Sequence, residues 1–385
     1  VGRNKINFVD LCQGEFGRKT AYTGVDQITP QNVAQVLSDT IGIHNRNRNL
    51  MDYLYRYYKG DQPILYREKL VRPEVNNKVV ENHALETVKF KAGQIYGEPI
   101  QYVCKKKKAS KETNEQVDRL NDYLDEANAD ARNIQLGIYQ SAVGTAYKAI
   151  LREDEWTKDG DLSPFRIFIP SPQDVYIVYS SVTGKPMLSV QILKDEDNQQ
   201  YYQCYSSRQY FKIQNGAVTE SGINGFGGIP IIEYPNNHDR LSDIEIAITM
   251  YDAINKYQSD RLNGVEQFVQ ALMKFKNCEI DEAEFVKMVK LGAVSVKDVG
   301  NGTQSDVDLM TAELNQSESQ VAKDDIYNNM LIVEAMPNRQ SNTGGDTGNA
   351  VYLRNGWDFA ERDAKLVEAF TKEAEKASAR IILNI

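Results

Sequence analysis

Cysteine is scarce in this sequence. Only four cysteines occur, Cys12, Cys104, Cys204 and Cys278, and each lies more than 70 residues from the next. The absence of any CxxC pair excludes a zinc knuckle, and the wide spacing argues against a disulfide-stapled fold. The cysteine pattern therefore indicates a protein that folds in a reducing compartment.

Long apolar runs are also missing. Runs such as Ile229–Ile232 and Met330–Val333 are far shorter than the roughly 18–20 residues that cross a bilayer. Residues Val1–Phe8 lack the basic-then-apolar profile of a secretory signal. We therefore expect no membrane partner.

Histidine is rare, and the common catalytic motifs are absent. His44, His83 and His238 lie in a polar stretch, a helical stretch and a loop, so each is interpreted as a surface or hydrogen-bonded core residue. There is no GxSxG, HExxH or GxxxxGK[ST] motif. Thr183–Lys185 resembles a fragment of a phosphate loop, but its place between two strand-like runs favours a hairpin turn. The sequence predicts no enzyme, no metal site and no cofactor.

The charge that is present is unevenly distributed. The chain has 385 residues, 41% of them apolar, with 45 basic and 54 acidic side chains and a net charge of −9. This length predicts two or three domains. Between Glu279 and Glu334 there are twelve acidic and four basic residues, which is nearly the whole net charge.

Helical and strand-like patterns occupy different parts of the first 240 residues. Thr29-Pro30 is typical of a helix start, a second helix is expected from Leu50 to Tyr58, and helical patterns continue to residue 142. One strand is expected at Ile100–Cys104. Between residues 144 and 235, runs rich in β-branched residues and tyrosine alternate with turn residues and predict an antiparallel meander. The fold class predicted from these patterns is α+β. The expected strands are Ala146–Arg152, Phe165–Ile169, Val175–Tyr179, Leu188–Leu193, Tyr201–Tyr205, Tyr210–Gln214 and Ile229–Tyr234.

Two long helices are predicted after residue 240. Ser242–Glu245 has the pattern of a capping box, and the helix that it opens is expected to continue to Phe275, a length of roughly 50 Å at 1.5 Å per residue. The second helix, Thr311–Val333, is expected to be ended by Pro337. A compact acidic unit is expected between them, with a helix at Asp281–Lys290, a strand at Ala293–Val296 and a turn at Gly300–Gly302.

A polar segment follows the second long helix, and helical periodicity resumes from residue 350 to residue 385. The segment has three glycines and no apolar side chain, so holding it in one conformation costs entropy that burial does not offset. Loops of this length between helices are uncommon unless they are functional. Its residues are therefore candidate site residues: Asn338, Arg339, Gln340, Ser341, Asn342, Thr343, Gly344, Gly345, Asp346, Thr347, Gly348 and Asn349.

Five segments, in order along the chain, resemble the portal proteins of tailed bacteriophages of the siphophage type. The match covers almost the whole chain, although no single motif is decisive. The segments are Asn76–Asn82 with Gly93–Ile100, then Ser171–Tyr179, then Gly228–Tyr234 with Asn236-Asn237, then Tyr251–Asn255 with Ser259, Asp260 and Asn263, and finally Gly344–Asn349 with the helix that follows.

The resemblance implies the domain order of a portal protein. It implies a ring of about twelve copies at one capsid vertex of the virion, assembled in the host cytoplasm, through which double-stranded DNA is packaged and later ejected. The implied partners are terminase, a head–tail adaptor, the major capsid protein and scaffolding protein. The implied parts are a wing (1–240), a first stem helix (241–276), a clip (277–310), a second stem helix (311–337), a tunnel loop (338–349) and a helix leading into the crown (350–385).

Docking and DNA contact are expected in different parts of this arrangement. In the loop, Arg339 is offset by Asp346, so DNA contacts there are expected to be loose, since each phosphate neutralised by a basic side chain strengthens binding. An acidic clip is expected to dock terminase and adaptor. Its candidate docking residues are Glu279, Asp281, Glu282, Glu284, Lys287 and Lys290.

Two other readings remain open from the sequence. One is an enzyme that acts on nucleic acid through a metal held by Asp252, Asp260 and Glu266, although these carboxylates are unevenly placed around a helix. The other is a helical scaffold or adaptor without a channel. A nuclease assay with added metal, run beside a native mass measurement, separates these readings from a ring.

Overall fold

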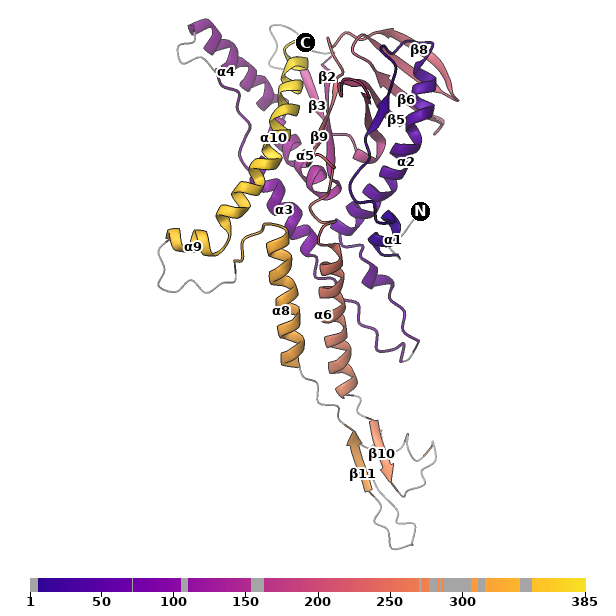
Figure 1. Ribbon diagram of the computed structural model, residues 1–385, viewed down its shortest axis with the longest axis vertical. Helices are drawn as coiled ribbons and strands as arrows, with labels where there is room; N and C mark the ends of the chain where they lie inside the picture. The colour runs from indigo at the N-terminus through magenta and orange to yellow at the C-terminus, as the bar shows by residue number, and fades with distance from the viewer. Residues whose placement is uncertain are drawn as a thin grey trace.

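The structure has two parts, an upper body and a narrow stalk (Figure 1). The computed structural model describes residues 6–70, 72–104, 110–153, 163–269, 272–276, 283, 286, 306–310, 316–339 and 348–385. The stalk consists of helices α6 (Ile248–Val269) and α8 (Gln316–Val333), which pack side by side. Strands β10 (Leu272–Lys276) and β11 (Asp306–Met310) continue the stalk at the end away from the body.

The body contains the other described helices, and the first long one differs from the prediction. Helix α2 is a single helix of 26 residues that begins at Val33, so the predicted separate helices opening at Thr29 and at Leu50 are wrong. The polar residues His44 and Asn47 occupy buried positions in the middle of this helix, so they interrupt the apolar stripe by which a continuous helix is recognised in the sequence. Among the described helices, none has the length and apolar character of a membrane span. The others are α1 (Phe8–Cys12), α3 (His83–Tyr96), α4 (Lys111–Glu126), α5 (Ala129–Val143), α9 (Gly348–Arg354), α10 (Trp357–Ile382) and the short 3-10 helices Pro63–Tyr66 and Pro172–Asp174.

The strands of the body form two sheets. In the six-stranded sheet, β4 to β8 are consecutive antiparallel neighbours, which confirms the meander for this part, and β1 pairs parallel with β4. A separate three-stranded antiparallel sheet has the order β3-β2-β9, so the single-meander prediction is wrong there. The strands are β1 (Ala21–Thr23), β2 (Thr145–Arg152), β3 (Phe165–Phe168), β4 (Val175–Ser180), β5 (Pro186–Lys194), β6 (Gln200–Tyr205), β7 (Gln209–Gln214), β8 (Ala217–Ile223) and β9 (Ile231–Pro235).

Two strand assignments also need correction. The sequence does not predict β8, because this edge strand is mostly exposed and lacks apolar alternation. The predicted strand at Ile100–Cys104 is extended chain without strand pairing. The combination of helices with largely antiparallel sheets confirms the α+β class.

The first helix of the stalk is shorter than the sequence predicts. Helix α6 begins at Ile248 rather than after Ser242, and it ends at Val269 rather than at Phe275. The last part of the predicted helix is β10, in which Leu272 lies opposite Met310 of β11. Helix α8 ends at Val333, as predicted, and the stretch 311–315 lies outside the described residues. Apart from positions 283 and 286, the predicted acidic unit between residues 277 and 305 also lies outside them.

The residues of the predicted capping box bind one another's backbone, since the Ser242 hydroxyl accepts the N–H of Ile244 at 3.2 Å and Glu245 accepts the N–H of Ser242, and they also bind the amino-terminal segment. The Ser242 hydroxyl donates to the carbonyl oxygen of Ala142 at 2.8 Å. Glu245 accepts the N–H of Gly17 at 2.6 Å and pairs with Arg18. Burial raises the pKa of Glu245 and lowers that of Arg18, while their mutual attraction opposes both shifts. The residues before the stalk are therefore fixed to the start of the chain.

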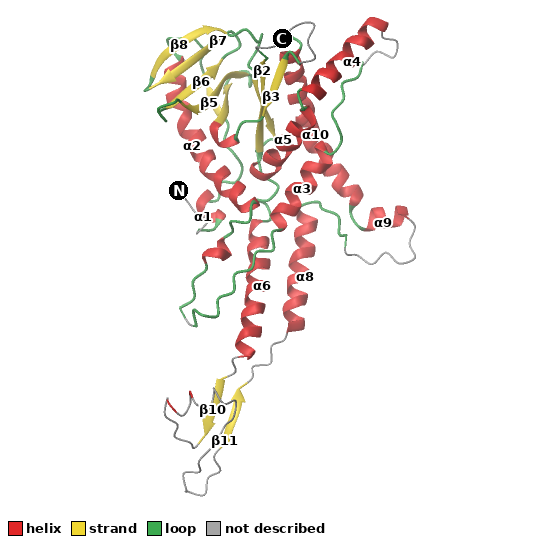
Figure 2. Cartoon of the chain, turned by 180° about the vertical axis from the view of Figure 1, so that it is seen from behind, coloured by secondary structure: helices red, strands yellow, loops and turns green. Residues whose placement is uncertain are grey.

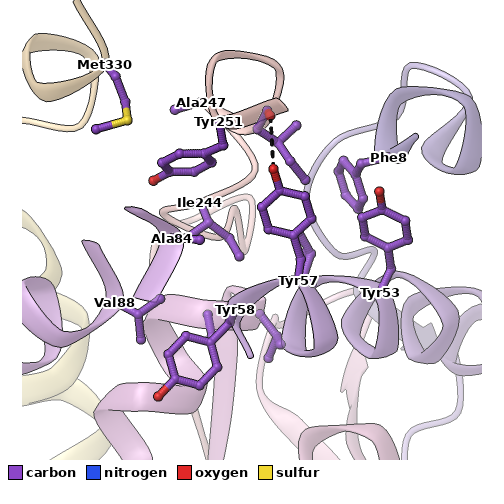
Figure 3. Close-up of a cluster of buried hydrophobic side chains, with 14 of the residues drawn as sticks. Phe8, Tyr53, Tyr57, Tyr58, Ala84, Val88, Ile244, Ala247, Tyr251 and Met330 are labelled. Carbon is purple, nitrogen blue, oxygen red and sulfur yellow. Dashed lines mark hydrogen bonds between the residues drawn. The ribbon is translucent and has the colours of Figure 1, made fainter. Parts of the chain in front are cut away.

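One apolar cluster joins the stalk to the body (Figure 3). Tyr57 of α2, Val88 of α3, Tyr251 of α6 and Met330 of α8 are all fully buried in it. Burial of one such side chain contributes about 1.5–3 kcal/mol. Four such side chains from four helices make the upper stalk and the lower body one packed unit.

Candidate functional site

The predicted loop lies between the end of helix α8 and the start of helix α9, both of which the structure describes. Asn338 and Arg339 follow the end of α8, and Gly348 and Asn349 lie in the first turn of α9. Gln340 to Thr347 lie outside the described residues, as do all six predicted docking residues, from Glu279 to Lys290. The structure therefore describes the residues on either side of the loop, which are called its anchors below: those at the end of α8 and those from α9 onward.

The chain leaves α8 through a tight helix-ending turn. Ala335 has a left-handed φ of 50°. Its N–H donates to the carbonyl of Ile332 at 3.2 Å, and the N–H of Met336 donates to that of Leu331 at 2.8 Å. These two bonds are those of a Schellman motif, in which the left-handed residue is usually glycine. The turn ends the helix before Pro337 and directs the chain toward the loop.

A buried carboxyl group lies in this turn. Glu334 accepts a hydrogen bond from the hydroxyl of Tyr251 on α6 and, at 2.8 Å, from that of Thr87 on α3. Only 2% of Glu334 is exposed. Removal from water raises its pKa to about 8, although the two hydrogen bonds act in the opposite direction. The group therefore joins three helices with its proton retained at neutral pH.

A series of ion pairs and hydrogen bonds between side chains connects the start of the loop to the stalk. Arg339 pairs with Glu86 of α3. Glu86 lies 3.0 Å from Nδ1 of His83, whose Nε2 lies 3.3 Å from Glu81. Glu81 in turn pairs with Lys323 of α8 at 2.6 Å. The hydrogen bond from His83, together with Arg339, holds the pKa of Glu86 below its ordinary value. The first loop residues are therefore linked to α8 through the amino-terminal part of α3.

The chain returns to the start of the loop after α9. The N–H of Asn338 donates to the carbonyl of Asn355 at 3.0 Å, just after α9. The sequence predicts one continuous helix from residue 350, but the chain breaks between α9 and α10 at Gly356, whose φ is 83°. Asp363 of α10 pairs with the buried Lys91 of α3 at 2.5 Å. The segment that contains the loop and α9 is thus closed at its base, where Arg339 and Asp363 both pair with side chains of α3.

An extended segment is fastened along α6 by side chains of that helix. Every second N–H of the segment is bound by every fourth residue of α6, because two residues of extended chain and four of helix both advance by roughly 6–7 Å. The acceptors on α6 are buried. The bonds are Glu81 N–H to Asn255 at 2.8 Å, Val79 N–H to Ser259 at 2.9 Å and Asn77 N–H to Asn263 at 2.7 Å.

The carboxylates of the alternative metal-site reading do not converge. Asp252 accepts the hydroxyl of Tyr57 at 2.8 Å, Asp260 pairs with Arg67 at 2.7 Å, and Glu266 accepts from the amide of Asn77 at 2.7 Å. Across the described ranges, no group of three or more His, Cys, Asp or Glu side chains is arranged to hold a metal ion. This arrangement gives the enzyme reading no support from the described residues.

The comparisons with known proteins identify the family. A sequence model described as "Phage portal protein, SPP1 Gp6-like" matches residues 37–385. The chain belongs to this portal protein family. No curated protein matches its sequence.

Solved structures that match this chain include two described as necks of GTA particles. The neck of the native particle, computed with C12 symmetry, is 11% identical over 80% of this chain and 77% of that chain, with a TM-score of 0.46. The neck of the empty particle, computed with C6 symmetry, is 10% identical over 76% of this chain and 78% of that chain, with a TM-score of 0.43.

Two of the segments that carried the portal resemblance meet in the structure. The extended segment within Asn76–Asn82 is the one fastened to Asn255, Ser259 and Asn263 of α6. Sequence reasoning did not identify Glu334 or the charged pair of Arg339 with Glu86 as parts of the loop anchors. The signal for Glu334 was its place beside the apolar run Met330–Val333, where an acidic side chain must find partners.

Proposed function

We propose that the chain is the subunit of a closed ring, of about twelve copies, at one capsid vertex of a phage-type virion. The ring is a conduit for packaging and ejection of double-stranded DNA. Membership of the portal family is the observation that carries this proposal. A body that continues into a two-helix stalk supports it (Figure 2), because such subunits can repeat side by side around an axis.

The net charge of −9 suits a conduit. A lining that neutralised many phosphates would hold DNA by counterion release, whereas a neutral or acidic lining repels it within a Debye length of about 8 Å at physiological salt. In this proposal the loop 338–349 reaches the channel and makes loose contacts. The pairing of Arg339 with Glu86 supports weak contacts, since it offsets a positive charge at the loop's start.

Docking of terminase and of the head–tail adaptor is assigned to the acidic stretch after β10, and major capsid and scaffolding proteins are assigned as partners of the body during assembly in the host cytoplasm. Reversing the charge of Glu282 and Glu284 together is expected to weaken adaptor binding while leaving the ring intact. Pull-down with adaptor and native mass of the same sample measure the two effects. Loss of the ring itself would contradict a docking role for these residues.

The ring is tested by the native mass of the purified chain. Twelve copies of 43.6 kDa give about 520 kDa, the size of a closed head-to-tail assembly. Light scattering and averaged electron micrographs should show one ring-shaped species of that size. A stable monomer at high concentration, or an open filament, would contradict the proposal, and a filament would favour a scaffold without a channel.

A further inference from the structure

An arm, described at residues 61–70 and 72–82, runs from the body along the stalk and back (Figures 1 and 2). Its two limbs are fixed to α6: Arg67 pairs with Asp260 at 2.7 Å, and Asn77 binds Asn263 at 2.7 Å. Within the arm, Lys69 donates to the carbonyl of Val75 at 3.0 Å. The arm is therefore held at both limbs before any partner is present.

An apolar side chain lies at the tip of this arm. Leu70 is 100% exposed, although the nearby Val75 is fully buried. An isolated exposed leucine is ordinary on a protein surface. The stretch from Arg67 to Lys78 has four basic and two acidic residues. Arg67 is paired with Asp260 and Arg72 with Glu74, so the tip keeps a small net positive charge from Lys69 and Lys78 against Glu68.

The exposed face of α8 has the complementary character. Val321 and Ile332 are each 68% exposed, and the residues between them at helical spacing are polar or acidic, including the exposed Asp324 and Asp325. Over the whole of Gln316–Val333 there are three acidic residues and one basic residue. Apolar side chains within an acidic surface suit an apolar tip within a basic one.

The two surfaces lie on different flanks of the stalk at the same level. The arm contacts the face of α6 that carries Ser259 and Asn263, whereas α8 contacts the face that carries Arg261, through Gln320. Arg67 of the arm lies beside Asp260, one residue from Arg261. Arg67 and Gln320 therefore lie at the same level along α6 but on different faces of that helix, while the far end of the arm, at Glu81, pairs with Lys323 of α8.

We propose that the arm tip around Leu70 packs on the exposed face of α8 around Val321 in the adjacent copy of the chain. A head-to-tail contact of this kind joins one flank of each subunit to the opposite flank of the next, and rotation about an axis along the stalk keeps both flanks level. The inference rests on the proposed ring and specifies which surfaces meet in it.

Paired cysteines test this contact. The variant with Leu70→Cys and Val321→Cys, oxidised after assembly, should give a ladder of linked subunits on a non-reducing gel. The matched control combines Leu70→Cys with Val182→Cys, because Val182 is 80% exposed but lies in the body turn after β4. This control and each single variant should remain unlinked. Linking of the control to the same extent would overturn the proposal.

A second measurement does not depend on thiol chemistry. Val321→Glu should raise the protein concentration for half-assembly by roughly tenfold, the factor expected for loss of one buried aliphatic contact. Val182→Glu should leave that concentration unchanged, and circular dichroism should show both variants folded.

The outcomes separate the contact from the ring. If the unsubstituted chain forms rings of the expected mass but the Leu70–Val321 pair does not link and Val321→Glu assembles normally, the arm contact is wrong and the ring stands. If the unsubstituted chain forms no ring, the proposed function fails, and the arm contact fails with it.

Discussion

Glu334 makes the stability of the joint between stalk and body depend on pH. Its pKa in the folded chain is raised to about 8 from an ordinary 4.5, so the folded chain retains a proton that the unfolded chain releases. The stabilisation is complete below about pH 4.5 and is lost as the pH rises toward 8. Half-buried Asp252, with its pKa raised to about 6, adds to the same trend.

Replacing this carboxyl group should flatten the trend. Glu334→Gln keeps the shape of the side chain but cannot ionise, so its free energy of unfolding should fall less between pH 5 and pH 8 than that of the unsubstituted chain. Chemical denaturation at several pH values measures the slope. Glu318→Gln, at an exposed position of α8, is the matched control and should keep the original slope. Equal slopes in all three proteins would contradict the assigned role of Glu334.

The side-chain ladder on α6 is a property of two elements together. Ser259 is fully buried and accepts the N–H of Val79. Ser259→Ala leaves that N–H without its partner, which costs about 1–3 kcal/mol for a buried donor. Thermal denaturation should show this loss of stability. Ser317→Ala, at an exposed position of α8, should change stability by less than about 0.5 kcal/mol. A loss no greater than that of the control would show that the extended segment is held by other contacts.

The loop between α8 and α9 can be shortened without touching its anchors. Removing residues 341–347 leaves Arg339 with its partner Glu86 and leaves the bond from Asn338 to Asn355. We expect rings of unchanged mass with impaired packaging or retention of DNA. The measurement is the amount of nuclease-protected DNA in assembled particles, compared with a deletion of equal size elsewhere in the surface. Unchanged packaging and retention of DNA would contradict a functional role for the loop and leave it only as a linker between α8 and α9.

Elements with a clear local pattern could be predicted from the sequence, and those set by distant partners could not. The strands from β4 to β7 are rich in β-branched residues and tyrosine and are bounded by turn residues, and α4 has a clear helical spacing of apolar residues. Leu272–Lys276 also has helical spacing, but pairing with Asp306–Met310 makes it a strand. The break at Gly356 was missed because a single glycine is tolerated within a helical pattern.

For the molecule as a whole, the order of parts could be predicted but their convergence could not. The sequence identified the polar loop and the segment Asn76–Asn82 separately. It gave no means of placing Glu81, Glu86 and Lys323 in one chain of charges, because these residues are brought together only by the packing of α3 against the stalk. Residue types in a sequence limit the possible partners of a charge, and the tertiary fold selects among them.

The hydrogen bond from Asn338 to Asn355 closes the base of a segment that contains both the loop and α9. Because that base is already joined, a longer peptide inserted between residues 340 and 347 would enlarge this segment without separating Asn338 from Asn355. Its closure entropy would rise by only about 0.6 kcal/mol for each doubling of length. An affinity tag or a fluorescent reporter could therefore be displayed there, once per subunit, without lengthening or separating α8 and α10.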